Sequence, residues 1–356
     1  MNKETIVFTG GGTAGHVVVN LALIPEFINK GYDVHYIGSY EGIEKELIEG
    51  LNGVTYHSIA TGKLRRYMSK ENFKDPFRVL KGIMQARKLI KKLKPRIVFS
   101  KGGFVSVPVV MAAKMTGTPS IIHESDYTPG LANRIASNFA NYVLTTFPET
   151  NQHLSQKKAK NVGAIVREEL FEGDKEMAFQ LTGLTSEKPI IMVMGGSAGA
   201  QKINQAVRES LPTLLKEFQL IHLCGKGNVD EATKQRGYVQ FEYVTDELKD
   251  LFAATDLVVS RAGSNAIFEF LALKKPMLLI PLSKQASRGD QILNANSFKK
   301  RGYAEVLEEE ELDSNSLIDS LKHLQENREK FQTNMSAYQP QQSKDEVIDL
   351  ILKTMK

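Results

Sequence analysis

Two glycine-rich turns are the first candidate sites for chemistry in this sequence. Gly10, Gly12 and Gly15 have the G-x-G-x-x-G spacing directly after the apolar run TIVFTG, and a second turn, GGSAGA, follows the run PIIMVM. Such a turn brings bare backbone N–H groups and the start of a helix to one point, which attracts a phosphate group. Two of these turns indicate a ligand that carries a diphosphate, although either turn alone is also compatible with a structural role.

Two familiar interpretations of these turns fit poorly. A dinucleotide site expects an acidic residue at the end of the second strand, to bind ribose, but that strand ends at Ser39. Residues 195–199 also fit the G-x-S-x-G elbow of hydrolases, with Ser197 as the nucleophile, and this needs an acid and then a histidine later in the chain. The only later histidines are His222, in a predicted strand, and His323, in a polar segment. NAD, FAD and a hydrolase site are therefore disfavoured.

Polar residues flank two more of the predicted elements in the first half of the chain. His16 stands at the glycine-rich helix start, where the helix dipole disfavours its protonated form and suits it to act as a general base. A purely structural histidine is the alternative. His123 and Glu124 end a predicted strand, at the edge where open α/β sheets bind ligands.

A further polar cluster lies in the second half of the chain. Arg261, Gly263 and Ser264 belong to a small-residue turn that opens a helix, which is again a candidate anion site. Glu269, beyond this turn, is placed to accept both ribose hydroxyls of a nucleotide. Residues 285–296 are rich in side chains that hydrogen-bond sugar hydroxyls, and an exposed polar loop is the alternative for them.

The elements that must position these residues alternate regularly along the chain. Strand-like runs occupy residues 5–10, 33–39, 96–100, 120–125 and 141–147, and after a pause near residues 161–173 they resume at 189–194, 220–224, 239–244, 256–260 and 276–281. β-Branched, nearly uninterrupted apolar strands separated by helical stretches are typical of a parallel sheet covered on both faces. We expect an α/β protein of two Rossmann-like domains facing across a cleft, over residues 1–165 and 166–340, with a last helix over 341–356 that packs back on the first domain.

Length and composition exclude several classes of protein. The 356 residues suit two domains, and 42% hydrophobic with 24% charged residues is typical of globular proteins. No apolar run approaches the ~18 residues of a membrane span, and the first residues lack the apolar stretch of a signal peptide. The single cysteine, Cys224, excludes an internal disulfide and is interpreted as a small buried residue.

One segment carries the whole excess of positive charge. Between Lys63 and Arg96 there are thirteen Lys or Arg against two acidic residues, whereas the complete chain has a net charge of only +5. Asp75 followed by Pro76 predicts a helix start and Pro95 predicts its end. The alternative to a special role is an ordinary surface helix, and most of its apolar residues are expected to face the sheet: Phe77, Leu80, Ile83, Met84, Leu89, Ile90 and Leu93.

Six motifs, in order, resemble one known family over essentially the whole chain. They are GGTAGH, GGFVSVP, HESDYTPGLAN, GGSAGA, RAGSNAIFEF and PLSKQASRGDQ. This set is similar to the inverting N-acetylglucosaminyltransferases of peptidoglycan synthesis, which convert lipid I to lipid II. The resemblance implies a GT-B fold, UDP-N-acetylglucosamine as the donor, undecaprenyl-diphospho-N-acetylmuramoyl-pentapeptide (lipid I) as the acceptor, and neither a metal nor a cofactor.

The resemblance also implies roles for individual residues. His16 or Glu124 would remove the proton of the attacking hydroxyl, with His16 preferred, while the backbone of Val244 would meet uracil. The donor residues that it implies are Thr13, Gly15, Asp126, Arg167, Ser197, Val244, Arg261, Gly263, Ser264, Glu269, Asp290 and Gln291. Those that it implies for the acceptor diphosphate are Gly11, Gly12, Gly102 and Gly103.

The chain departs from the usual pattern of this family in three motifs. Ala14 stands where the first loop usually has glycine, and Asp290 replaces the first residue of a usual Gln-Gln pair. The usual His-Glu-Gln-Asn run ends here in Ser125 and Asp126, so that a carboxylate replaces a neutral amide.

A lipid-linked acceptor also gives a reason for the basic segment, because each basic residue near an anionic membrane contributes about 1 kcal/mol of attraction. We expect a peripheral protein on the cytoplasmic face of the bacterial plasma membrane, with proteins of cell-wall synthesis and division as further partners and no nucleic acid. A transferase for another lipid such as diacylglycerol, a UDP-sugar 2-epimerase and a non-catalytic nucleotide-sugar binding protein remain alternatives. The expected membrane contact consists of Arg65, Arg66, Tyr67, Met68, Lys70 and Phe73.

Overall fold

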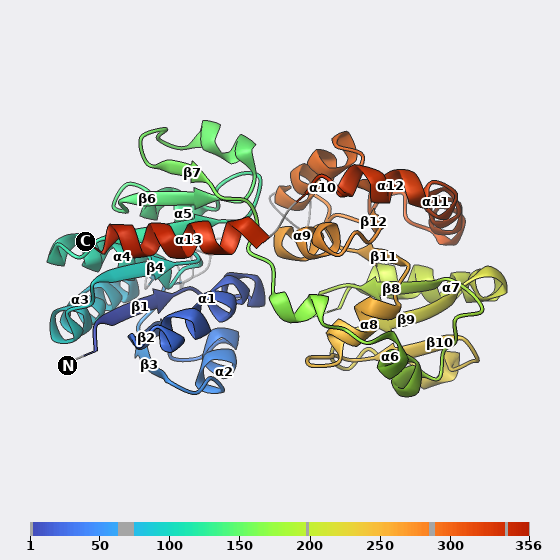
Figure 1. The fold of residues 1–356 in the computed structure, drawn as a ribbon, viewed down its shortest axis with the longest axis horizontal. Helices are drawn as coiled ribbons and strands as arrows, with labels where there is room; N and C mark the ends of the chain where they lie inside the picture. The colour runs from blue at the N-terminus through green and yellow to red at the C-terminus, as the bar shows by residue number, and fades with distance from the viewer. Residues whose placement is uncertain (1–2, 63–74, 197–198, 285–288, 339–340, 356) are drawn as a thin grey trace. The chain divides into compact units, whose positions relative to one another are not determined.

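The chain divides into two compact units in the computed structural model (Figure 1), which describes residues 3–62, 75–196, 199–284, 289–338 and 341–355. Unit 1 comprises residues 1–166 and 340–356, and unit 2 comprises residues 167–339. The division falls one residue beyond the expected boundary at 165. The C-terminal segment belongs to unit 1, as the amphipathic pattern of its sequence predicts.

Unit 1 contains a seven-stranded parallel sheet in the order β3-β2-β1-β4-β5-β6-β7. Its strands are β1 (Thr5–Thr9), β2 (Asp33–Ser39), β3 (Val54–Ile59), β4 (Ile97–Ser100), β5 (Ser120–Glu124), β6 (Tyr142–Thr145) and β7 (Ala159–Asn161). Its α-helices are α1 (Val18–Asn29), α2 (Ile43–Glu49), α3 (Asp75–Leu93), α4 (Ser106–Thr116), α5 (Leu131–Ala136) and α13 (Gln341–Thr354).

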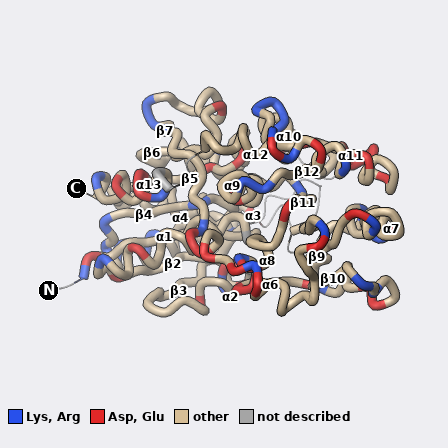
Figure 2. Tube along the Cα trace, turned by 45° about the vertical axis from the view of Figure 1, so that its right-hand side comes forward, with Lys and Arg blue, Asp and Glu red and all other residues tan. Residues whose placement is uncertain are grey.

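The core of unit 1 follows from the alternation of side chains along β1. Ile6 and Phe8 point to one face of the sheet, where α1 and α13 cover them, and Val7 points to the other face, where α3 and α4 pack. Val347 and Ile351 bring α13, red in Figure 1, into the same cluster as the N-terminal strands. A sheet covered on both faces explains why β1 and β4 contain no charged residue. Helices such as α10 and α13 carry charged residues of both signs, as Figure 2 shows.

Unit 2 repeats this plan with six parallel strands in the order β10-β9-β8-β11-β12-β13. They are β8 (Ile190–Met194), β9 (Gln219–Leu223), β10 (Tyr238–Phe241), β11 (Leu257–Ser260), β12 (Met277–Leu279) and β13 (Ala304–Val306). The α-helices are α6 (Lys175–Thr182), α7 (Gln201–Glu217), α8 (Leu248–Ala254), α9 (Ser264–Ala272), α10 (Asp290–Lys300), α11 (Ser314–Glu326) and α12 (Arg328–Met335). Cys224 directly follows β9 and is buried, as predicted.

Three strands escape the apolar pattern, and all three lie at sheet edges. β3, β7 and β13 each have a neighbour on one side only, and most of their residues are partly exposed or exposed. A half-covered edge strand does not need a continuous apolar run, so the sequence signal is weak there.

The order of the strands reverses between β1 and β4 in unit 1 and between β8 and β11 in unit 2. In open parallel sheets such switch points open a crevice beyond the carboxyl ends of the strands, where ligands bind. The loops after β1 and β4, and those after β8 and β11, are the glycine-rich segments that the sequence singles out. In the described parts of the chain, no helix has both the length and the apolar character that crossing a bilayer demands.

Candidate active site

The two glycine loops of unit 1 are packed backbone against backbone. The Gly11 N–H donates to the carbonyl of Gly102 over 3.2 Å. A Cβ atom at Gly103 would overlap the Gly11 carbonyl, and Gly12 and Gly103 have φ angles of +92° and +83°. Only glycine combines this backbone conformation with so close an approach. The predicted acceptor residues Gly11, Gly12, Gly102 and Gly103 are therefore brought together.

Glu44 fills the first glycine loop, and nothing in the sequence points to it. Its carboxylate is 1% exposed and accepts hydrogen bonds from the Gly12 N–H at 3.1 Å and from the Ser39 N–H at 3.3 Å. The Ser39 hydroxyl donates to the same carboxylate. Cβ atoms at Gly11 or Gly42 would collide with this carboxylate. The N–H groups of Gly11 and Gly12 thus have acceptors within the protein. The Glu44 carboxylate lies at the loop N–H group where a bound phosphate was expected.

His16 is held in one tautomer by the first loop. Its Nδ1 lies 3.0 Å from the Gly11 carbonyl oxygen and 3.2 Å from the Thr13 hydroxyl. A carbonyl oxygen can only accept, so in the neutral ring Nδ1 carries the proton and Nε2 is the basic nitrogen. The residue is half-buried in the short 3₁₀ turn Ala14–His16 that precedes α1. A half-buried imidazole in a fixed orientation is suited to proton transfer.

Glu124 has a different environment from His16. It is 5% exposed, and its two oxygens accept from the Asp126 N–H (2.9 Å), the Gly130 N–H (2.9 Å) and the Asn133 side-chain amide (3.0 Å). Burial, and then the nearby Asp126, raise the pKa of Glu124 above its usual value. The Glu124 carboxylate organises the loop after β5, because its hydrogen bonds hold this loop in place.

Lys101 lies between the loops of β4 and β5. It follows β4 directly, is 2% exposed, and its ammonium donates to the Ser125 hydroxyl. Its neighbour His123 is fully buried, and burial holds the pKa of that ring well below its usual value, so the ring is neutral. The contact between Lys101 and Ser125 is not evident from sequence spacing.

In unit 2 the predicted ribose ligand and a predicted diphosphate ligand form an ion pair. Arg167 Nε lies 2.8 Å from Glu269 Oε1, and Arg167 Nη2 lies 3.2 Å from Glu269 Oε2. Glu269 stands on α9 and is buried. Each carboxylate oxygen accepts up to two hydrogen bonds, so this bidentate pair fixes the orientation of Glu269 and leaves it able to accept ribose hydroxyls.

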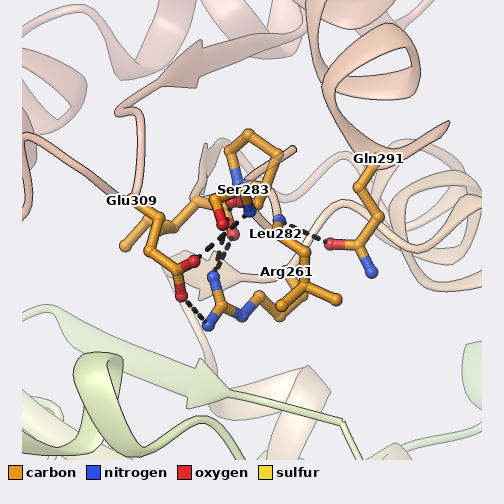
Figure 3. Close-up of polar contacts among 7 residues, drawn as sticks. Arg261, Leu282, Ser283, Gln291 and Glu309 are labelled. Carbon is orange, nitrogen blue, oxygen red and sulfur yellow. Dashed lines mark hydrogen bonds and ion pairs between the residues drawn. The ribbon is translucent and has the colours of Figure 1, made fainter. Parts of the chain in front are cut away.

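Arg261 has partners that the sequence does not predict (Figure 3). Its Nη1 donates to the carbonyls of Ile280 (3.2 Å) and Pro281 (3.4 Å), and its Nη2 is paired with Glu309. Burial opposes the ionised form of Glu309, but the hydrogen bond and the charge of Arg261, together with the Ser283 N–H, outweigh burial and lower the pKa of that carboxyl. Glu309 also accepts from the Ser283 N–H at 3.3 Å. Arg261 therefore anchors the loop after β12.

The remaining donor residues lie at loops of unit 2. The Gln291 amide oxygen accepts from the Leu282 N–H at 3.0 Å, so its amide nitrogen is the group left to donate, as Figure 3 shows. Asp290 is the first residue of α10, Gly263 and Ser264 open α9, and Val244 is buried after β10. Ser197 and residues 285–288 lie outside the described part of the chain.

The apolar residues of α3 fall on two faces rather than one. Ile83 and Ile90 pack into the unit, but Phe77, Leu80 and Met84 are 75%, 59% and 56% exposed. The expectation that most of this stripe faces the sheet is thus wrong for these three, since a Gly82–Ile83–Ala86–Ile90 face makes the contact instead. The expected membrane residues, Arg65 to Lys70 and Phe73, lie outside the described residues.

Metal ligands do not cluster in the parts of the chain that the structure describes: no group of three or more His, Cys, Asp or Glu is placed to hold an ion. At the candidate site, Arg167 is paired with Glu269, and Arg261 is bonded to Glu309 and to backbone carbonyls.

Comparison with known proteins places the fold and these loops in one class. The Glycosyltransferase family 28 N-terminal domain matches residues 6–145, and the Glycosyltransferase family 28 C-terminal domain matches residues 190–351. The chain belongs to glycosyltransferase family 28, and its two Rossmann-like units have the GT-B architecture.

Individual relatives are similar over their full length. A protein of Oceanobacillus iheyensis named UDP-N-acetylglucosamine--N-acetylmuramyl-(pentapeptide) pyrophosphoryl-undecaprenol N-acetylglucosamine transferase is 62% identical, over 100% of this chain and 99% of the relative. The protein of that name from Geobacillus thermodenitrificans is 61% identical over 94% of each chain. The crystal structure of Acinetobacter baumannii MurG has a TM-score of 0.77 at 23% identity, covering 98% of this chain and 99% of that one.

The fold is also shared with enzymes of another class. A crystal structure of UDP-N-acetylglucosamine 2-epimerase has a TM-score of 0.69 at 11% identity, over 99% of this chain and 96% of the other. At that identity the likeness concerns the fold alone.

Proposed function

We propose that this protein transfers N-acetylglucosamine from UDP-N-acetylglucosamine to the 4-hydroxyl of undecaprenyl-diphospho-N-acetylmuramoyl-pentapeptide, which makes it an inverting transferase of peptidoglycan synthesis. The observation that carries the proposal is the full-length identity of 62% to a relative that bears the name of this activity. The 2-epimerase alternative has a likeness of fold at 11% identity in its favour, and a diacylglycerol acceptor has no comparable support.

His16 is the general base of the proposed reaction. The acceptor oxygen attacks the anomeric carbon, the bond from that carbon to the UDP oxygen breaks, and His16 Nε2 takes the hydroxyl proton. The fixed tautomer of the ring supports this role. Glu124 is the weaker candidate, because backbone and amide N–H groups already hold both of its oxygens.

Unit 2 holds the donor. Glu269 accepts the ribose hydroxyls and Arg167 fixes its carboxylate, while the backbone of Val244 contacts uracil. The N-terminus of α9 at Gly263 and Ser264 faces the diphosphate with its positive end. Thr13, Gly15, Asp126, Ser197, Asp290 and Gln291 complete the proposed donor contacts, and Arg261 supports the site by ordering residues 280–283.

The second glycine loop holds the acceptor diphosphate. Gly102 and Gly103 precede α4, an 11-residue helix whose N-terminus attracts anions. Gly11 and Gly12 shape this site, but their N–H groups donate to Gly102 and Glu44. The acceptor is therefore bound mainly by the loop after β4, with the loop after β1 as its packing partner.

The protein works as a peripheral protein at the cytoplasmic face of the plasma membrane, where its lipid-linked acceptor resides and where cell-wall synthesis and division proteins are its potential partners. Three exposed apolar side chains on α3, with Lys81 and Lys88 on the same helix, support a surface that enters an anionic interface. The basic residues 63–74 extend this surface in the sequence.

Transfer of radiolabelled N-acetylglucosamine to a panel of polyprenyl and glycerolipid acceptors tests the proposal. Label should appear on the lipid I analogue and be absent from diacylglycerol. Formation of UDP-N-acetylmannosamine from the donor alone, without acceptor, would identify a 2-epimerase instead.

The same assay tests whether the reaction needs a metal. Transfer should persist in excess EDTA with protein that has been purified free of metal, because the proposed site stabilises the leaving diphosphate with N–H donors and arginine. Activity that is lost in EDTA and restored by Mg²⁺ or Mn²⁺ would contradict this account of the leaving group.

A further inference from the structure

A buried lysine joins the two loops on which the acceptor site of unit 1 is built. Lys101 is the first residue after β4 and directly precedes Gly102. Its backbone N–H donates to the Thr9 carbonyl at 2.9 Å, its stem lies beside Gly10, and its ammonium donates to the Ser125 hydroxyl after β5. The side chain therefore touches the loops of three adjacent strands at the carboxyl edge of the sheet.

The two sides of Lys101 differ in charge. The loop after β5 brings two carboxylates, Glu124 and Asp126, and the neutral ring of His123, whereas Lys101 is the cation that acts on all three. On the side of β1 the neighbour is Gly10, which carries no charge. Burial lowers the pKa of Lys101, and the attraction of Glu124 and Asp126 works in the opposite direction.

A buried lysine at this position is not required by packing alone. Its ammonium is 2% exposed and needs compensation, and an apolar side chain of similar length would fill the same space without that penalty. What an apolar residue would not supply is positive charge beside two carboxylates, directly behind the loop of Gly102 and Gly103.

We propose that Lys101 is a positioning residue of the acceptor site, whose buried ammonium, bonded to Ser125 between Glu124 and Asp126 in the sequence, holds the loop 123–126 against the glycine loops. The role in transfer rests on the proposed function, whereas the charge coupling of Lys101 with Asp126 does not. Glu124, already held by three N–H groups, is stabilised by the same cation.

The test is a double-mutant cycle of Lys101→Met and Asp126→Asn in the full chain, read by transfer kinetics and by thermal unfolding at several pH values. Lys101→Met should lower kcat/KM for the acceptor on the order of 10- to 100-fold through misplacement of the loop. The acid limb of its kcat/KM profile should move to higher pH, because removal of a cation raises the pKa of neighbouring carboxylates.

In the Asp126→Asn background the same lysine substitution should have little further effect, since one of the two carboxylates that it compensates is gone. Ser125→Ala is the matched control: it removes the hydrogen bond to Lys101 but not the charge, so the acid limb should stay in place. Rescue of folding by Asp126→Asn would support the proposal even where Lys101→Met alone fails to fold.

Equal effects of Lys101→Met in both backgrounds, with an unmoved acid limb, would overturn the proposal and leave Lys101 as a packing residue. A lysine variant that remains unfolded with Asp126→Asn would do the same. If the wild-type protein transfers no sugar, the proposed function fails, and the coupling between Lys101 and Asp126 is still read from the unfolding midpoints.

Discussion

At the scale of single residues, the charged groups of the candidate site are fixed by partners from distant parts of the chain. Arg167 and Glu269 are 102 positions apart, and Arg261 and Glu309 are 48 apart. Such pairs orient a side chain without being visible in any local motif. His16 and Glu124 differ from these pairs, because each is held by residues close to it in the sequence.

His16→Ala should lower kcat about 10²–10⁴-fold, because it removes the proposed general base. UDP affinity should hardly change, since the residues assigned to uracil and ribose, Val244 and Glu269, lie in unit 2. His16→Asn is the control that keeps a polar side chain of similar size, and it should be equally impaired. A His16→Ala enzyme within about threefold of wild type, far below the effect expected for a base, would transfer the role to Glu124 or to solvent.

Glu269→Ala should weaken UDP binding by about 2–3 kcal/mol, because hydrogen bonds to a charged acceptor are lost. The matched variant Arg167→Ala should weaken it too, since the carboxylate loses its fixed orientation. Calorimetric titration with UDP and its 2′,3′-dideoxy analogue measures both. The mutant should no longer distinguish the two ligands; unchanged discrimination would mean that another residue binds the ribose.

At the scale of elements, α3 has two apolar faces, one buried and one exposed. The face with Ile83 and Ile90 packs under the sheet, and the face with Phe77, Leu80 and Met84 is exposed among basic residues. An amphipathic helix with this composition is suited to lie in a membrane interface. The sequence conceals this division, because the apolar residues of both faces recur along α3 at nearly the same spacing.

The triple change Phe77→Glu, Leu80→Glu and Met84→Glu should abolish sedimentation with anionic vesicles and leave UDP binding intact. About 0.5 M salt should release the wild-type protein from them, because it screens exposed charges strongly. Met177→Glu with Leu181→Glu is the control, since these α6 side chains are 51% and 46% exposed in unit 2. Normal sedimentation of the triple variant would place the membrane contact elsewhere.

At the scale of the whole molecule, α13 ties the end of the chain to unit 1. Val347, Ile348 and Ile351 are buried in its core cluster, and Lys344 forms a 2.7 Å ion pair with Glu26 on α1. The stability of unit 1 therefore depends on residues that follow the whole of unit 2 in the sequence.

Ile351→Ala should destabilise unit 1 by about 2–5 kcal/mol through loss of buried contacts and the cavity that remains. Amide hydrogen exchange should rise across the seven-stranded sheet and stay unchanged in unit 2. Lys353→Ala, an exposed position on the same helix, is the control without effect. Equal protection of unit 1 in the Ile351 variant would contradict the packing of α13 on it.

The sequence by itself determines the alternation of strands and helices, the turns with bare glycines and the motif order of the family. These are local or periodic features, because φ preference and side-chain spacing are encoded by neighbours in the chain. Edge strands β3, β7 and β13 are not determined in this way, since partial cover leaves them without an apolar signal.

Only the tertiary structure decides which groups form hydrogen bonds and ion pairs with one another at the site. Glu44 reaches the Gly12 N–H from 32 positions away, and Lys101 reaches Ser125 from 24. Such contacts depend on which strands become neighbours, and the reversal of strand order between β1 and β4 brings their loops together. A buried charge must be compensated by whatever the fold places beside it, and that neighbour is a property of the sheet order rather than of any motif.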